Sequence, residues 1–87
     1  MIRSKYIIFD DGDKGLPVVF SPLLQHNQVA GGKPVISAGY CDVRVKIEGD
    51  EKTTEWDVWG KSTSLRKSCR PVEDKEILNQ YLRYDCL

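Results

Sequence analysis

The 87-residue chain has one histidine, no paired cysteine motif, no net charge and no long apolar run. With His26 as the only histidine, a metal site built from several histidines is excluded. The three cysteines lie far apart without a Cys-x-x-Cys spacing, which argues against a zinc knuckle and a disulfide framework. Since 13 basic residues balance 13 acidic ones, no chain-wide field attracts nucleic acid, although a local basic patch is compatible. We expect neither a metal nor a cofactor.

The lack of a long apolar run also indicates where in the cell the protein is expected. No stretch resembles a signal peptide or a membrane span, which favours a cytoplasmic protein with reduced cysteines and no membrane contact. A chain of this length forms one domain, residues 1–87, and buries only about 60 to 65 per cent of its unfolded surface. Either a monomer or a homodimer is therefore expected.

What the sequence does contain is one long alternating stretch, from Val35 to Ile47. Laid straight at about 3.3 Å per residue it would reach roughly 43 Å, whereas a compact chain of this size is about 30 Å across. We expect a single strand that bends near Gly39, where the missing side chain permits a bulge or a sharp coil. Its odd positions form the dry face: Val35, Ser37, Gly39, Cys41, Val43, Val45 and Ile47.

Three shorter segments also read as strands. They are Lys5–Phe9, Leu16–Phe20, which belongs at an edge because Pro17 cannot donate, and Glu55–Gly60, which returns antiparallel after a polar turn over residues 49–54. Alternation places Trp56 in the core and leaves Trp59 as a lid or an exposed contact. Residues 61–70 have few apolar anchors and read as a loop followed by a short strand.

Two helices are predicted. Ser21-Pro22 favours a helix start, with one or two turns to Ala30 that pack Leu23, Val29 and Ala30 under the sheet. Beyond Pro71 an amphipathic helix follows, capped by Asp74. Its apolar stripe is Ile77, Leu78, Tyr81, Leu82 and Tyr84. The fold class is α+β, a small single domain with a curled antiparallel sheet of four or five strands, a short middle helix and a C-terminal amphipathic helix.

Two apparent motifs fail on spacing. Gly60-Lys61-Ser62-Thr63 resembles the end of a phosphate-binding loop, but Glu55 stands where the pattern requires glycine. The acidic run after Phe9 lacks the calcium-loop spacing and reads as a solvated turn.

Two sets of side chains are candidates for function. His26 suits a structural or capping role, ligand binding or catalysis, in that order. The cations Lys61, Arg66, Lys67 and Arg70 follow Trp59 closely, as cations and aromatic rings do in proteins that bind single-stranded nucleic acid. An ordinary solvated face is nevertheless the favoured interpretation of these cations, with single-stranded nucleic acid and an acidic protein partner as the alternatives.

Several segments together resemble a small uncharacterised protein family of bacteria and tailed phages. They are Phe20-Ser21-Pro22 with His26 and Val29-Ala30, Val35 to Tyr40, Trp59 to Leu65, and Pro71 to Leu82. The resemblance covers most of the chain and implies no activity. It implies that six residues act together: His26, Ser37, Gly39, Gly60, Ser62 and Ser64.

These observations leave three functional hypotheses. The first is a small non-enzymatic binding or interaction module with a protein partner. The second is a single-stranded nucleic-acid binder that uses Trp59 and the basic segment after Gly60. The third is a small enzyme with His26 in a polar pocket closed by serine hydroxyls. The candidate binding residues are His26, Ser37, Tyr40, Trp59, Lys61, Ser62, Ser64, Arg66, Lys67 and Arg70.

Overall fold

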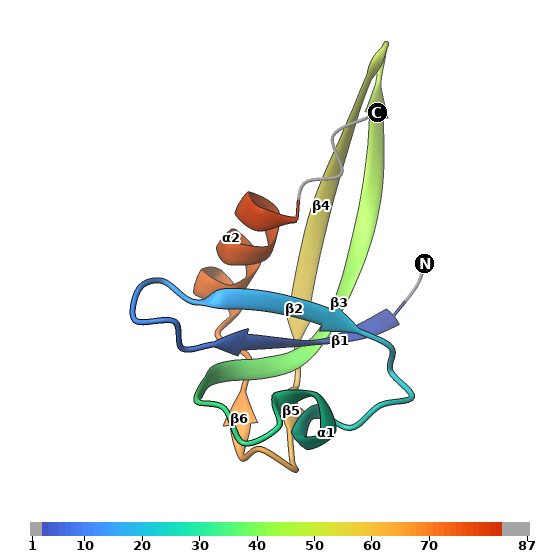
Figure 1. Cartoon of the computed structure of the whole chain (residues 1–87). Coiled ribbons are helices and arrows are strands. Elements are labelled where there is room, and N and C mark those ends of the chain that lie inside the picture. Colours follow the sequence, from blue (N-terminus) through green and yellow to red (C-terminus); the bar gives the residue numbers. More distant parts are fainter. Residues whose placement is uncertain (1–2, 83–87) are drawn as a thin grey trace.

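The computed structural model describes residues 3–82 and has a curled four-stranded antiparallel sheet with a helix beside it (Figure 1). The strand order is β2-β1-β3-β4, and β5 and β6 form a separate hairpin. The elements in chain order are β1 (Arg3–Phe9), β2 (Leu16–Phe20), α1 (His26–Ala30), β3 (Val35–Glu48), β4 (Glu51–Trp59), β5 (Lys61–Ser62), β6 (Lys67–Ser68) and α2 (Pro71–Tyr81). The α+β prediction is confirmed. Neither helix in residues 3–82 is long and apolar enough to span a membrane.

The sheet separates two small cores, one on each face. On the face that α2 covers, the buried members are Tyr6, Ile8, Cys41, Trp56, Ile77 and Leu78. On the face that α1 covers, Ile7, Ala30 and Ala38 are buried, and Val29 and Leu65 pack against them. Alternation along β1 explains the division, because neighbouring residues of a strand point to opposite faces. We call these surfaces the α2 face and the α1 face.

A bulge in β3 changes the alternation expected for its first residues. The register with β1 shifts between Ile8 and Phe9, which pair with Ser37 and Val35 and leave Ile36 as the extra residue. Val35 therefore packs in the α1-face core and Ile36 in the α2-face core. The prediction that Val35 shares a face with Ser37 is wrong, because alternation inverts at a bulge that only the partner strand reveals.

Strand β3 is curved, as predicted (Figure 1), but Gly39 keeps a regular register with Tyr6, so no bulge lies at this residue. A Cβ atom there would lie 2.6 Å from the Trp59 carbonyl oxygen and 3.3 Å from the Tyr6 ring. Glycine at this position lets the chain that leaves β4 cross close over β3.

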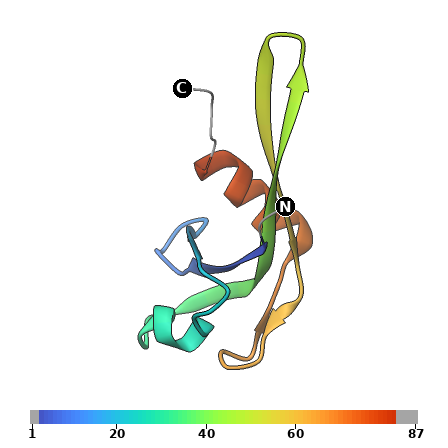
Figure 2. The ribbon, with the colours of Figure 1, turned by 90° about the vertical axis from the view of Figure 1, so that its right-hand side faces the viewer.

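Strands β3 and β4 form an arm that projects from the body of the protein (Figures 1 and 2). A two-residue turn at Gly49 and Asp50 joins them, because Glu48 pairs with Glu51. The prediction of a turn over residues 49–54 is wrong, since β4 already begins at Glu51. The arm stretches the long axis of the molecule to 44 Å, well beyond the compact diameter expected from length. Val45 and Ile47 are not dry, being 60% and 67% exposed.

Helix α2 lies along the outer edge of β4. The Trp56 backbone N–H donates to Asn79 Oδ1 at 2.8 Å, and Asn79 Nδ2 donates to the Trp56 carbonyl at 3.4 Å. The amide side chain therefore bonds the edge strand as a neighbouring strand would. The helix begins at Pro71 with Arg70 as its cap residue, so the prediction of Asp74 as the cap is wrong.

The middle helix has the predicted length of one to two turns but starts later than the predicted Ser21-Pro22. Ser21 closes a turn through its Oγ and carbonyl oxygen, and the helix begins at His26, where the Gln25 N–H donates to Gln28 Oε1 at 2.8 Å. Leu23 was predicted to pack under the sheet but is 91% exposed, because it precedes the helix. On α2, Tyr81 is 50% exposed in place of buried. Tyr84 lies outside the described residues.

Candidate binding surface

A row of side chains crosses the α1 face from one edge of the sheet to the other. The registers place Phe20 opposite Lys5, Lys5 opposite Tyr40, and Tyr40 opposite Trp59. Directly paired residues of antiparallel strands project from the same face with their Cβ atoms close together. We call Phe20, Lys5, Tyr40 and Trp59 the aromatic row. Its three rings are all half-buried.

Two rings of this row stack on each other, and Lys5 and the neighbouring Arg3 each lie over one of them. Tyr40 and Trp59 stack with their centroids 6.3 Å apart and an interplanar angle of 21°. The Arg3 guanidinium carbon lies 5.8 Å from the centre of the Trp59 ring, and Lys5 Nζ lies 6.0 Å from that of Tyr40. Both distances suit attraction between a cation and the negative face of a ring. The row therefore presents aromatic surface together with two positive charges.

His26 is buried and packs against two rings of the aromatic row. Its side chain is 4% exposed, and its ring meets those of Phe20 and Tyr40 edge to face at 5.5 and 6.1 Å. Since a carbonyl oxygen only accepts, the 2.9 Å contact of Nε2 with the Gly39 oxygen assigns the proton to Nε2. Burial lowers the pKa of His26, and Lys5 acts in the same direction, although the hydrogen bond to Gly39 opposes them. The neutral ring fixes Tyr40 in place.

The predicted convergence of His26 with three serine hydroxyls is found only in part. Ser64 Oγ accepts from the Asn27 N–H at 3.3 Å, next to His26, and lies 3.3 Å from Ser62 Oγ. These contacts tie the β5–β6 hairpin to the start of α1. Ser37 is buried elsewhere, where it donates to Asp74 at 2.7 Å. Ser37 therefore does not belong to this group.

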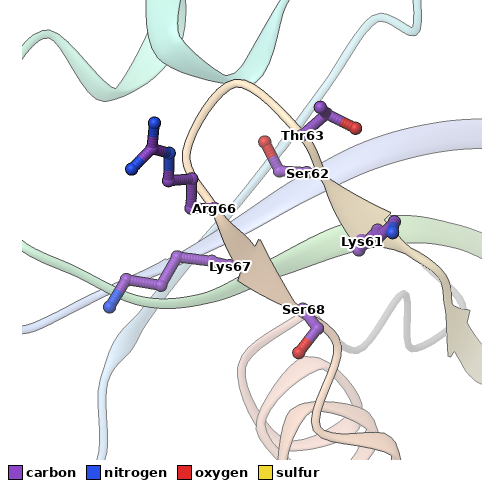
Figure 3. A pocket seen from close by; sticks show the side chains of 6 residues that line it. All are labelled: Lys61, Ser62, Thr63, Arg66, Lys67 and Ser68. Atoms are coloured by element: carbon purple, nitrogen blue, oxygen red, sulfur yellow. The ribbon is translucent and has the colours of Figure 1, made fainter.

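The β5–β6 hairpin carries a shallow pocket of about 350 Å³ with cations and hydroxyls around it (Figure 3). Arg66 and Lys67 extend to the same side of the hairpin, and Ser62 and Thr63 lie at the turn (Figure 3). Arg66 has a left-handed backbone at φ 54°. The full lining is Lys61, Ser62, Thr63, Arg66, Lys67 and Ser68, which we call the hairpin pocket. Cations with neighbouring hydroxyl donors are suited to binding an anion.

The hairpin pocket adjoins the aromatic row. Gly60, at φ 79°, joins Trp59 to Lys61, and a Cβ atom on Gly60 would lie 2.9 Å from the Tyr40 ring. The link is therefore held directly against the row. We refer to the row, the adjacent Arg3 and the pocket together as the binding surface.

Arg70, the fourth predicted cation, lies apart from this surface. Its Nε donates to Asp74 Oδ1 at 3.0 Å, and Nη2 lies 3.0 Å from the same oxygen as an ion pair without hydrogen-bond geometry. Its backbone N–H donates to Asp74 Oδ2 at 2.9 Å. The guanidinium and the backbone N–H of Arg70 both bind Asp74 of the same chain, so Arg70 is a structural residue.

Asp74 is the centre of a buried network that sequence reasoning missed. The carboxylate is 0% exposed and accepts from the Tyr6 hydroxyl at 2.6 Å and the Ser37 hydroxyl at 2.7 Å, besides the two bonds from Arg70. Burial raises the pKa of Tyr6, and the hydrogen bond to Asp74 adds to the effect. This network joins β1, β3 and α2 beneath the sheet.

Sequence reasoning also missed Arg3, Lys5 and Phe20 as members of the binding surface. Alternation along each strand was visible in the sequence, but the row can be recognised only from the three strand registers.

Comparison with models of protein families, with curated proteins and with solved structures finds no match to this chain.

Proposed function

We propose that the protein is a small non-enzymatic binding module that holds an anionic chain on the binding surface. The observation that supports this proposal is the hairpin pocket, where three cations and the exposed hydroxyl residues Thr63 and Ser68 surround one depression beside stacked rings. The chain as a whole is neutral, so any attraction must come from local charge. Arg3 and Lys5 add two cations at the aromatic row.

Two acidic side chains of β4 already pair with cations outside the binding surface. Glu55 contacts Lys46 and Lys75 at 2.9 Å each, and Asp57 contacts Arg44 at 2.8 Å. Both carboxylates are therefore paired with cations of the arm and of α2. The cations of the hairpin pocket make no ion pair within residues 3–82 and are available to a ligand.

The aromatic row favours single-stranded nucleic acid as the anionic chain, over an acidic peptide. Unpaired bases stack on aromatic side chains while cations track the phosphates, and base stacking contributes about 1 to 3 kcal/mol per base. An acidic peptide would use the cations alone. The buried His26, with Nε2 held by the Gly39 carbonyl, supports a structural role for this residue in such a module.

The test is fluorescence anisotropy with a labelled 15-nucleotide thymidine oligomer and, separately, a labelled polyglutamate. If each of the three hairpin cations neutralises one phosphate, the log–log salt slope is about −2, and affinity falls about twentyfold between about 50 and 200 mM salt. Lys67→Glu should weaken oligomer binding about tenfold. Lys52→Glu changes the charge equally on the distant arm and should leave binding within about twofold.

Each outcome has a defined meaning. Equal effects of Lys67→Glu and Lys52→Glu would show that the hairpin pocket is not the site. Binding of polyglutamate in place of the oligomer would overturn the nucleic-acid assignment and retain an acidic protein partner. Absence of binding to both polymers would refute the proposed function.

A further inference from the structure

The arm leaves one edge of β3 without a partner. Strand β1 pairs with β3 only as far as Arg3 opposite Asp42, while β4 accompanies β3 to Glu48. Within residues 3–82, the segment 43–48 therefore has a neighbouring strand on one side only. Figures 1 and 2 show this part of the ribbon projecting beyond the body of the protein.

A free strand edge of this kind is a template for another strand. Its unpaired N–H and C=O groups favour pairing, and proteins commonly protect such edges with charge or with a partner. Here the same segment also exposes Val45 and Ile47, at 60% and 67%. An edge with two exposed apolar side chains favours a partner.

We propose that a second copy of this chain pairs with the edge, antiparallel, about a two-fold axis at Lys46. Side chains that meet across a ladder must share a face, so the axis passes through a residue. With Lys46 at the axis, Arg44 lies opposite Glu48 of the second copy, and Val45 lies opposite its Ile47. Each contact occurs twice, as a two-fold interface requires.

Other registers fit less well. An axis at Val45 would carry Glu48 of the second copy opposite Asp42, where Arg3 of β1 already pairs with the same edge. An axis at Ile47 would place Val45 opposite the turn residue Gly49 and shorten the ladder. Of these three registers, the Lys46 register is the one that places Val45 opposite Ile47 and Arg44 opposite Glu48.

The meeting of two Lys46 side chains at the axis does not oppose this arrangement. Lys46 Nζ lies 2.9 Å from Glu55 Oε2 of its own chain. The hydrogen bonds from Lys46 and Lys75 lower the pKa of Glu55 to about 2, so this carboxylate is charged at neutral pH. Each Lys46 therefore brings to the axis a carboxylate that it shares with Lys75.

The length of the free edge also fits. In this register Val43 lies opposite Gly49 of the second copy, and the turn that follows reaches Asp42, where β1 begins with Arg3. The second copy thus fills the free edge and ends at the existing neighbour strand. This inference concerns the arm and does not depend on the binding surface.

Sedimentation equilibrium of the full chain, from about 10 to 500 µM, tests the proposal. The wild-type chain should dimerise, and Arg44→Glu and Glu48→Arg should each weaken the dimer about tenfold or more, because both place like charges opposite each other twice. An equimolar mixture of the two variants should restore association. In the mixed dimer the two substituted side chains face each other with opposite charge, and the remaining Arg44 of one chain faces the remaining Glu48 of the other. The matched control, Lys52→Glu on β4, should dimerise as the wild type does.

Arg44→Glu also removes the ion pair of Arg44 with Asp57 of its own chain, so its unfolding midpoint is measured in parallel, whereas Glu48→Arg separates dimerisation from folding. Glu48 makes no ion pair within residues 3–82, so Glu48→Arg should retain the wild-type circular dichroism and unfolding midpoint. A wild-type chain that stays monomeric at 500 µM would overturn the proposal. So would a dimer that both charge reversals leave unchanged, or a mixture that fails to associate.

Discussion

Removal of the Asp74 carboxylate is the sharpest test of how α2 is fixed to the sheet. Asp74→Ala would leave the Tyr6 hydroxyl, the Ser37 hydroxyl and the Arg70 guanidinium without their acceptor. Breaking a buried ion pair by removing one partner costs about 3 to 5 kcal/mol. We expect the free energy of unfolding to fall by about 4 kcal/mol.

That loss is large for a domain of this size. At about 0.05 to 0.15 kcal/mol per residue, a chain of 87 residues has roughly 4 to 13 kcal/mol of stability. Urea unfolding followed by tryptophan fluorescence measures the change. With a slope near 1 to 3 kcal/mol per molar urea, the midpoint should fall by about 1 to 4 M.

Two further variants make this prediction refutable. Glu73→Ala alters an exposed acid on the same helical turn and should change stability by only about 0.5 kcal/mol. Asp74→Asn retains the shape and one acceptor but loses the charge that Arg70 faces, so a loss of about 2 kcal/mol is expected even if the alanine variant fails to fold. An Asp74→Ala protein within about 1 kcal/mol of the wild type would refute the reasoning.

Three other perturbations follow from the same contacts. Gly39→Ala should cost about 2 to 3 kcal/mol in urea unfolding, because its Cβ would meet the Trp59 carbonyl oxygen at 2.6 Å, and a loss below about 1 kcal/mol would contradict that approach. The lowered pKa of His26 means that the unfolded chain binds the proton more readily, so stability should fall as pH drops below 6.5. His26→Phe should flatten this slope, and an unchanged slope would contradict the assignment. The raised pKa of Tyr6 predicts the opposite slope above pH 10, since the unfolded chain then loses a proton that the native state keeps, and Tyr6→Phe should reduce it.

Local patterns in the sequence predicted much of the sheet. The apolar run Lys5–Phe9 lies within β1, Leu16–Phe20 matches β2, and the long alternating stretch from Val35 lies within β3. These segments were recognisable because strand alternation and turn residues are local signals. The C-terminal helix was also recognisable from its apolar stripe, and Pro71 marks its first residue.

Features that depend on a partner strand could not be predicted. The bulge at Ile36 inverts the faces of Val35 and Ile36, and only the register with β1 reveals it. Asp74 was predicted to be a helix cap because acidic residues favour helix starts. Its carboxylate oxygens instead accept hydrogen bonds from the hydroxyls of Ser37 and Tyr6, which are distant in the sequence. The polar segment 49–54 was predicted to be a turn, because its sequence carries no local signal that residues 51–54 extend β4 alongside β3.

The sequence predicted many of the residues of the candidate site but not how they are arranged. Tyr40, Trp59, Lys61, Arg66 and Lys67 were all named from sequence, and the structure brings the hairpin cations beside the stacked rings. Ser37 and Arg70 were assigned to the same site, but both turn to the buried Asp74. A serine or arginine side chain gives no local sign of which face its partner occupies.

Nuclear magnetic resonance titration of the full chain with the thymidine oligomer tests the binding surface most directly. The two indole N–H signals serve as an internal comparison, because Trp59 lies in the aromatic row whereas Trp56 donates to the Leu82 carbonyl at 2.8 Å. We predict that the Trp59 indole and the amides of residues 61–68 shift during the titration, while the Trp56 indole does not. Shifts confined to the arm or to α2, or no shifts at all, would contradict the account.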